Sequence, residues 1–156
     1  MQIIERNNEI QAVTKLIATF PVTAILGPRQ CGKTTLAQLF GANHSFDLEN
    51  PRDAARLEQP QLALENLTGL IVIDEIQLMP DIFPLLRFLV DHNDDQKYLI
   101  LGSASRDLIR QSSETLAGRI AYYQLGGFRL TDVRSAKAQA LWLRGGLPRS
   151  FLAETD

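Results

Sequence analysis

The chain has 156 residues, of which 45% are hydrophobic and 22% are charged, and its formal net charge is −2 at pH 7. This length and composition are typical of a single globular domain, and no apolar run approaches the ~20 residues that a membrane span needs. The single cysteine excludes an internal disulfide, and the two histidines lack the spacings of a zinc site.

The N-terminal residues 1–9 do not combine a basic stretch with an apolar one, so a secretory signal is not indicated, and we expect one cytoplasmic domain over 1–156. Charge is uneven along the chain: residues 47–95 hold 11 acidic and 3 basic side chains, whereas residues 119–149 hold 6 basic and 1 acidic. The basic stretch can line a nucleotide pocket or contact an acidic partner, but solvated arginines are the simpler interpretation. A nucleic-acid partner is not indicated, because basic and aromatic residues do not cluster.

The first predicted elements are a helix, a strand and a second helix. Apolar residues at helical spacing, preceded by a capping-box pattern at Asn8, predict a helix over 8–19. The apolar run over 22–26 predicts a buried strand that leads into a glycine loop. Residues 33–40 predict the next helix, with Gly41 as its C-cap.

The rest of the chain continues this alternation. Further strands are predicted over 44–48, 70–74, 97–102 and 119–125. Further helices are predicted in pieces over 51–66, and over 81–91, 106–117 and 131–143. Strands that alternate with helices predict an α/β fold, with a mainly parallel sheet covered by helices on both faces.

Residues 27–34 match the phosphate-binding pattern G-x-x-x-x-G-K-[ST]. Its glycines let the backbone curl so tightly that several N–H groups converge on a polyphosphate. We expect Lys33 to reach the β- and γ-phosphates beside the positive end of the following helix, and the Thr34 hydroxyl to ligate Mg²⁺. The residues expected to contact the nucleotide are Gly27, Pro28, Arg29, Gln30, Cys31, Gly32, Lys33, Thr34 and Thr35. Cys31 is either an oxidisable thiol or, more simply, a small packing residue.

Asp74 and Glu75 follow the apolar run over 70–73, so they lie at the carboxyl end of a predicted strand, where open α/β sheets collect their ligands. We expect Asp74 to hold magnesium, usually through water, and Glu75 to polarise the water that attacks the γ-phosphate. Such an acidic pair is often only a solvated strand end, but here it follows a phosphate loop by some 40 residues. Position 77 is glutamine where a GTPase has the glycine of D-x-x-G, and no N-K-x-D motif occurs, which favours ATP.

A glutamate directly after the aspartate is typical of P-loop ATPases with an additional strand between the two phosphate-site strands. In that type a polar residue on the additional strand senses the γ-phosphate, and residues 97–105 fit this position. Ser103 or Ser105 would then orient the water or contact the phosphate. Alternatively, both serines only cap the helix that follows.

With these parts in place, the chain resembles prokaryotic AAA-type P-loop ATPases, which pair an N-terminal ATPase domain with a C-terminal domain of unknown function. The matching segments run along nearly the whole chain, at 27–30, 32–36, 74–77, 102–103, 116–119 and 141–148. The resemblance implies a P-loop NTPase fold whose five-stranded parallel sheet has the order 5-1-4-3-2. It also implies an ATPase core without its C-terminal domain, either as an excised fragment or as a short natural form.

The resemblance further implies roles for Arg119 and Pro148. Arg119 stands where such ATPases carry an arginine that stabilises charge on the transferred phosphate, often in a neighbouring subunit of a homo-oligomer. The turn at 146–148 is similar to a glycine–proline element that related ATPases place against the nucleotide base. Alternatively, Arg119 is a surface arginine at the start of a strand, and Pro148 marks a helix-ending turn.

Three functions remain open from the sequence. The leading hypothesis is an ATPase that hydrolyses Mg-ATP to ADP and phosphate and so drives a conformational change in an attached domain or partner. The second is a nucleotide-gated switch that binds ATP with little turnover of its own, because Arg119 would have to come from a neighbour. The third is a small-molecule or nucleic-acid kinase, which is less favoured because no arginine-rich acceptor lid is seen.

Overall fold

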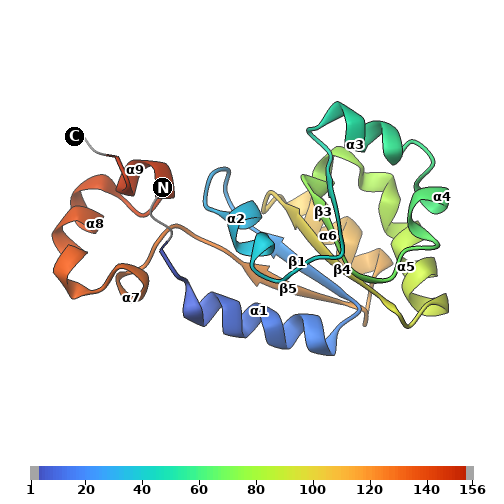
Figure 1. Ribbon diagram of the computed structural model, residues 1–156, viewed down its shortest axis with the longest axis horizontal. Coiled ribbons are helices and arrows are strands. Elements are labelled where there is room, and N and C mark those ends of the chain that lie inside the picture. Colours follow the sequence, from blue (N-terminus) through green and yellow to red (C-terminus); the bar gives the residue numbers. More distant parts are fainter. Residues whose placement is uncertain (1–3, 154–156) are drawn as a thin grey trace.

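In a computed structural model, which describes residues 4–153, helices cover both faces of a central sheet (Figure 1). The strands are β1 (Val22–Leu26), β2 (His44–Asp47), β3 (Gly69–Asp74), β4 (Gln96–Gly102) and β5 (Ile120–Gln124). The α-helices are α1 (Asn7–Thr19), α2 (Lys33–Gln38), α3 (Pro51–Arg56), α4 (Pro60–Leu64), α5 (Phe83–His92), α6 (Arg106–Thr115), α7 (Leu130–Val133), α8 (Ala138–Arg144) and α9 (Pro148–Phe151). Short 3₁₀ helices span Ile76–Leu78, Pro80–Ile82 and Ser135–Lys137.

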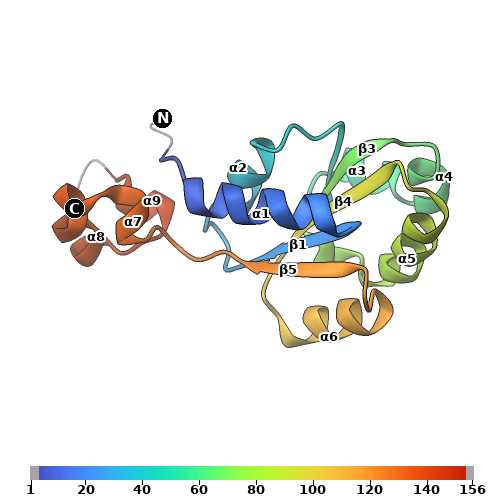
Figure 2. The same cartoon turned by 90° about the horizontal axis from the view of Figure 1, so that it is seen from below.

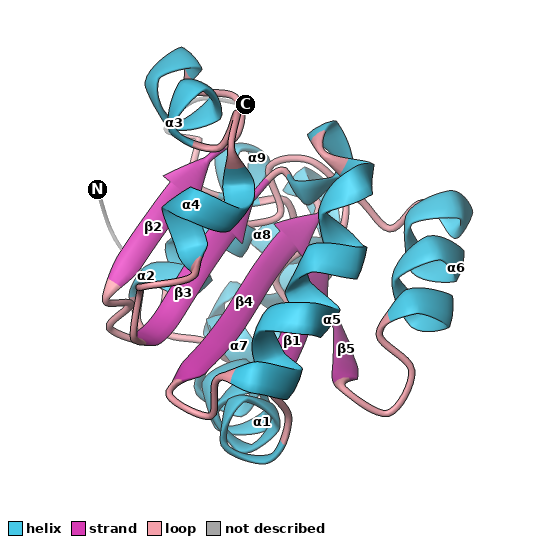
Figure 3. Ribbon diagram, turned by 90° about the vertical axis from the view of Figure 1, so that its right-hand side faces the viewer, coloured by secondary structure: helices cyan, strands magenta, loops and turns pink. Residues whose placement is uncertain are grey.

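The five strands are parallel and lie in the order β2-β3-β4-β1-β5, which is the predicted order 5-1-4-3-2 read from the other edge. β1 lies between β4 and β5, with Val22 level with both Tyr98 and Ile120. Figure 3 shows the arrowheads of β2, β3 and β4 pointing the same way, and since all pairs are parallel, the carboxyl ends of the five strands share one edge of the sheet. The loops that follow β1 and β3 therefore meet at that edge.

Alternate side chains of β1 pack into two separate cores. Ala24 joins the core that α5 and α6 cover, whereas Ile25 joins the core that α1 and α2 cover. In Figure 2 α1 and α6 lie on opposite sides of the sheet. All five residues of β1 are buried, as expected for a central strand covered on both faces. The predicted α/β architecture is thus confirmed.

The C-terminal segment, which carries α7, α8 and α9, lies beside the sheet, next to the start of α1 (Figure 1). Two glycines hold its ends together: a Cβ on Gly127 would lie 2.6 Å from the carbonyl carbon of Gly146. The N–H of Phe128 also donates to the oxygen of Gly146 at 2.5 Å. Side chains at these glycines would push the two backbones apart, so they bring the residues after Gly146 back toward the sheet.

Three local predictions were wrong. The predicted capping box at Asn8 is not formed, because α1 already begins at Asn7 and no side-chain hydrogen bond caps it. The predicted C-cap Gly41 lies beyond the end of α2, in a left-handed turn with φ of 65°. The continuous helix predicted over 131–143 is broken at Arg134, whose φ of 64° is incompatible with a helix.

Within residues 4–153, no helix has the length and apolar character needed to cross a bilayer.

Candidate functional site

The loop between β1 and α2 contains glycines that its geometry requires. Gly32 adopts a left-handed conformation with φ of 97°, which side chains disfavour. A Cβ on Gly27 would lie 2.2 Å from the carbonyl oxygen of Leu125, a distance at which atoms overlap. Gln30 has φ of 62°, an uncommon conformation for a residue with a side chain. The loop is therefore curled tightly against the end of β5.

Lys33 is folded into this loop. Its Nζ donates to the backbone oxygens of Gly27 at 3.0 Å and of Pro28 at 2.9 Å, and the residue is only 6% exposed. Within the described part of the chain, residues 4–153, no carboxylate forms an ion pair with this ammonium group. A buried cation that is solvated only by carbonyl groups favours binding of an anion at the loop.

Thr34 and Asp74 bring two oxygen atoms together at the carboxyl edge of the sheet. Thr34 Oγ1 donates to Asp74 Oδ2 at 2.6 Å, and the backbone N–H of Glu75 donates to Asp74 Oδ1 at 2.8 Å. Burial raises the pKa of the Asp74 carboxyl, while these two hydrogen bonds oppose part of that effect. A hydroxyl and a carboxylate side by side match the hard oxygen ligands that Mg²⁺ prefers.

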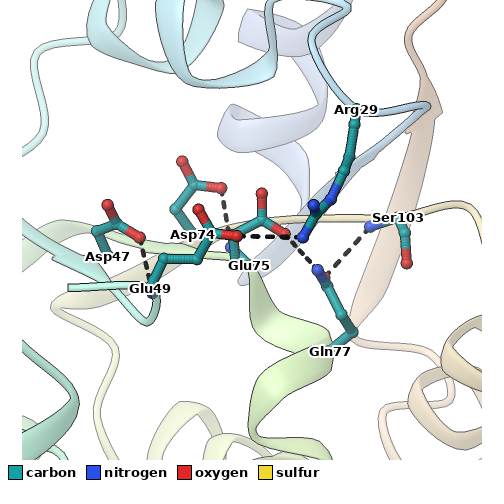
Figure 4. Close-up of polar contacts among 7 residues, drawn as sticks. All are labelled: Arg29, Asp47, Glu49, Asp74, Glu75, Gln77 and Ser103. Carbon is teal, nitrogen blue, oxygen red and sulfur yellow. Dashed lines mark hydrogen bonds and ion pairs between the residues drawn. The ribbon is translucent and has the colours of Figure 1, made fainter. Parts of the chain in front are cut away.

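Glu75 has an unusual backbone conformation, with φ of 56° and ψ of 44°. A glutamate in the left-handed region costs on the order of 1–3 kcal/mol, and such conformations cluster at functional sites. The Glu75 carboxylate accepts a hydrogen bond from the Gln77 amide, as Figure 4 shows. The backbone thus turns sharply straight after β3, and the carboxylate is held by the amide of Gln77.

A cavity of about 470 Å³ lies between the phosphate loop and the C-terminal segment, a volume that fits a small organic ligand. Its lining residues come from the start of the chain, the loop with α2, the end of β3 and the C-terminal segment: Ile4, Arg6, Gln30, Cys31, Gly32, Lys33, Thr34, Thr35, Leu36, Gln38, Leu39, Glu75, Phe128, Pro148, Arg149 and Leu152. A Cβ on Gly32 would lie 3.8 Å from Cγ of Pro148, so the fold brings this proline next to the loop.

Other loop residues face different surroundings. The Arg29 guanidinium is exposed and pairs with Oε1 of Glu49 at 3.2 Å, outside the cavity lining (Figure 4). Cys31 is fully buried in the core beneath α1 and α2, which agrees with the simpler interpretation of a packing residue. Thr35 is exposed at the cavity wall, and Pro28 contributes its carbonyl to Lys33.

The two serines after β4 have different surroundings. Ser105 is the N-cap of α6, and its Oγ accepts from the N–H of Leu108 at 3.2 Å. Ser103 donates its backbone N–H to Oε1 of Gln77 at 3.3 Å. Neither serine lines the cavity formed by the described residues. Ser105 thus has the capping role that the sequence left as an alternative.

Arg119 lies at the opposite edge of the sheet from the phosphate loop. It directly precedes β5, and its carbonyl accepts from the N–H of Val22, at the amino end of β1. Its guanidinium donates to Oδ1 and Oδ2 of Asp91 at 2.5 and 2.8 Å. This bonding lowers the pKa of the Asp91 carboxyl. The structure therefore does not bring Arg119 to Lys33 of the same chain.

Arg6 is a site residue that sequence reasoning missed. It is 5% exposed, and its Nη1 and Nη2 donate to the backbone oxygens of Cys31 at 3.2 Å and Gly126 at 2.8 Å. Its guanidinium lies 5.0 Å from the centroid of the Phe128 ring. Arg6 thus links the phosphate loop to the C-terminal segment. Its partners are distant in the sequence, so the residues around Arg6 gave no signal of this role.

Comparison with known sequences identifies relatives over almost the whole chain. A family model described as an AAA domain matches residues 19–133. The uncharacterized proteins Rv2008c of Mycobacterium tuberculosis and Mb2031c of Mycobacterium bovis are each 49% identical over 158 aligned residues. The alignments cover 99% of this chain and 36% of each mycobacterial protein, so the chain spans about a third of their length.

Comparison with solved structures finds the same fold in distant proteins. The Walker-type ATPase PABY2304 of Pyrococcus abyssi is similar with a TM-score of 0.67 and 16% identity, over 94% of this chain and 65% of that protein. The ORC1 protein of Aeropyrum pernix, solved in complex with DNA, has a TM-score of 0.57 and 15% identity, over 88% and 49% of the two chains. A signal transduction ATPase with numerous domains from Pyrococcus horikoshii has a TM-score of 0.56 and 16% identity, over 96% and 27%.

Proposed function

The chain belongs to the AAA domain family, and we propose that it binds Mg-ATP at its phosphate loop and hydrolyses it to ADP and phosphate. One observation carries this proposal: Lys33, Thr34 and Asp74 converge at the carboxyl edge of the sheet, beside a cavity of about 470 Å³ that Glu75 also lines. A buried cation, a hydroxyl next to a carboxylate, and a second carboxylate thus lie around one ligand-sized space.

The residues at this edge fit a magnesium ion. The Thr34 hydroxyl and the Asp74 carboxylate, 2.6 Å apart, are the two groups that would hold it, directly or through water. When bound, the ion would neutralise charge on the β- and γ-phosphates. Lys33 would exchange its bonds to the carbonyls of Gly27 and Pro28 for charge-assisted bonds to phosphate oxygens.

In the hydrolytic step, Glu75 would accept a proton from the attacking water. Glu75 lines the cavity, and its left-handed backbone carries a cost in stability that is typical of functional sites. We propose Ser103 as the residue that reads the terminal phosphate, because its backbone is bonded to Gln77 beside Glu75. Ser105 is less suited to this role, since its hydroxyl already caps α6.

The purine base of the nucleotide would lie against the C-terminal segment. Pro148 and Phe128 contribute apolar surface to the cavity wall, and no guanine-reading motif occurs in the sequence, so we propose adenine as the preferred base. Because Arg6 bonds to both the loop and Gly126, nucleotide binding would be transmitted to the C-terminal segment, and from there to an attached domain or partner.

The position of Arg119 favours a second candidate, a switch that binds ATP and turns it over slowly on its own. Arg119 lies at the far edge of the sheet and is paired with Asp91, so it would act only on a nucleotide held by a neighbouring subunit. Without such a neighbour, the site would lack this cation in the transition state. The rate of phosphate release per subunit, measured over a range of protein concentrations, separates the two functions. A rate that rises with concentration supports assembly, and a high, constant rate rejects the switch.

The hydrolytic function is tested with Glu75→Gln. This variant should bind ATP with unchanged affinity while its rate of phosphate release falls about 10²- to 10⁴-fold, the range for loss of a general base. The matched control is Glu114→Gln, at an exposed position of α6. Wild-type phosphate release by Glu75→Gln would contradict the assignment of the base.

A further inference from the structure

Gln77 connects two strand ends through a single side-chain amide. It lies in the 3₁₀ turn after β3, where its Nε2 donates to Oε2 of Glu75 and its Oε1 accepts from the backbone N–H of Ser103. Figure 4 shows the amide between these two groups. The end of β3 and the end of β4 are thus joined beside the candidate site.

The chemistry of the two partners suits an amide at this position. A carboxylate only accepts hydrogen bonds and a backbone N–H only donates them, so the connecting group must carry a donor and an acceptor together. This also fixes which end of the amide faces which partner. Glutamate at position 77 would keep the acceptor but lose the donor, and methionine would keep the length but lose both.

The backbone around Gln77 is shaped to allow these contacts. A Cβ on Gly102, the last residue of β4, would lie 2.9 Å from Oε1 of Gln77 and 2.9 Å from Cγ2 of Ile76. A side chain at position 102 would therefore push the amide away from Ser103. On the other side, the left-handed conformation of Glu75 turns its carboxylate toward Gln77.

We propose that Gln77 is a positioning residue that fixes the Glu75 carboxylate relative to the end of β4, a role that rests on the proposed ATP hydrolysis. Both ends of the Gln77 amide are bonded to protein groups, Nε2 to Glu75 and Oε1 to Ser103, so Gln77 acts through Glu75 and not on the nucleotide. A shift of Ser103 toward or away from a terminal phosphate is then passed to the carboxylate through one rigid amide. The amide thereby makes the position of the Glu75 carboxylate depend on what is bound at the carboxyl end of β4.

The test compares Gln77→Met and Gln77→Glu in the wild type and in a Glu75→Gln background, with kcat, KM and the Kd for ATP measured for each. In the wild-type background, both changes should lower kcat about 10- to 100-fold, as misplacement of a catalytic group does, and leave the Kd within about twofold. In the Glu75→Gln background, the same changes should have no further effect on kcat, because the group they position is already lost. Gln61→Met, at an exposed position of α4, is the matched control.

The outcomes are distinguishable. A wild-type kcat in Gln77→Met, or a further loss of the same size in the Glu75→Gln background, overturns the role of Gln77 while the wild type remains active. If Gln77→Met does not fold, Gln77→Glu carries the same comparison, because it retains the bond to Ser103. Absence of phosphate release by the wild type overturns the proposed hydrolysis itself, and the inference with it.

Discussion

The hydroxyl of Thr34 lies 2.6 Å from Oδ2 of Asp74 and joins the start of α2 to the end of β3 across 40 residues of sequence. This contact depends on the sheet order, because β3 and β1 are separated only by β4 and their carboxyl ends share one edge. Two polar residues that are distant in the sequence thereby bring their side-chain oxygen atoms together.

Asp74→Asn should make the nucleotide-free protein more stable at pH 7. Burial raises the pKa of Asp74 in the folded state above its ordinary value of 3.8. The contribution of this carboxyl to stability is therefore fully present below the unfolded pKa and is lost as the pH rises through the raised, folded pKa. The gain in unfolding midpoint from Asp74→Asn should shrink as the pH is lowered toward 4. The exposed Asp94→Asn is the control, and a less stable Asp74→Asn at pH 7 would count against the buried carboxylate.

Binding of Mg-ATP should make the wild type more stable than Asp74→Asn at pH 7. At a concentration of about 100 times its Kd, a ligand that binds only the folded state stabilises it by about 2.7 kcal/mol. Wild type should gain this much in magnesium and lose most of it in a chelator, whereas Asp74→Asn should respond little to magnesium. Thermal unfolding with ATP, with and without the metal, measures the difference. Equal magnesium dependence in the two proteins would exclude Asp74 as a ligand.

Gly27→Ala should destabilise the fold, since the new Cβ would lie 2.2 Å from the carbonyl oxygen of Leu125. We expect a loss of about 1–3 kcal/mol in the free energy of unfolding, as for other overpacked sites. Gly126→Ala is the matched control: a Cβ there meets nothing within 4 Å, and the loss should stay within about 0.5 kcal/mol. Denaturant unfolding distinguishes the two, and equal stability of both variants would contradict the tight packing of the loop.

Pro148→Ala should weaken binding of ATP but not of inorganic triphosphate. The ring lies beside Gly32 at the apolar wall of the cavity, and removing two methylene groups from contact with a base should cost about 5- to 15-fold in affinity. Titration of both ligands measures this difference. Pro60→Ala, at the start of α4, serves as control. An equal loss for both ligands would place Pro148 at the phosphates instead of the base.

A mixture of Arg119→Ala and Glu75→Gln should be more active than either variant alone. Each variant lacks one group, and a neighbouring subunit with an intact Arg119 would restore the site that still has Glu75. Phosphate release by the mixture, compared with the separate proteins at the same total concentration, measures this complementation. Arg119→Ala alone should bind ATP normally. Activity of the mixture that equals the mean of the separate variants would contradict a role between subunits.

The sequence predicted the parts of the site that depend on local pattern. The strand at 22–26, the glycine loop after it and the acidic strand end at Asp74 all follow from spacing and residue type, and the sheet order followed from family resemblance. Contacts between distant segments left no such pattern. The bonds of Arg6 to Cys31 and Gly126, and the bond between Gln77 and Ser103, became visible only in the fold.

The sequence also did not predict where a helix is interrupted or where some side chains point. Apolar periodicity over 131–143 predicted one helix, but it contained no signal that Arg134 would adopt φ of 64°. The sequence also left open that Ser105 caps a helix and that Arg119 lies at the other edge of the sheet from Lys33. Direction in space, unlike residue type, is set by tertiary packing.

The most direct test of the account is calorimetric titration of the chain with Mg-ATP, alongside Lys33→Ala and the exposed control Lys15→Ala. We predict one molecule of Mg-ATP bound per chain, weaker binding of Mg-GTP, and a loss of about 10- to 150-fold in ATP affinity for Lys33→Ala, the range for removal of a charged hydrogen bond. Lys15→Ala should bind as the wild type does. Binding that is undetectable in the wild type, or that is unchanged in Lys33→Ala, would contradict nucleotide binding at this loop.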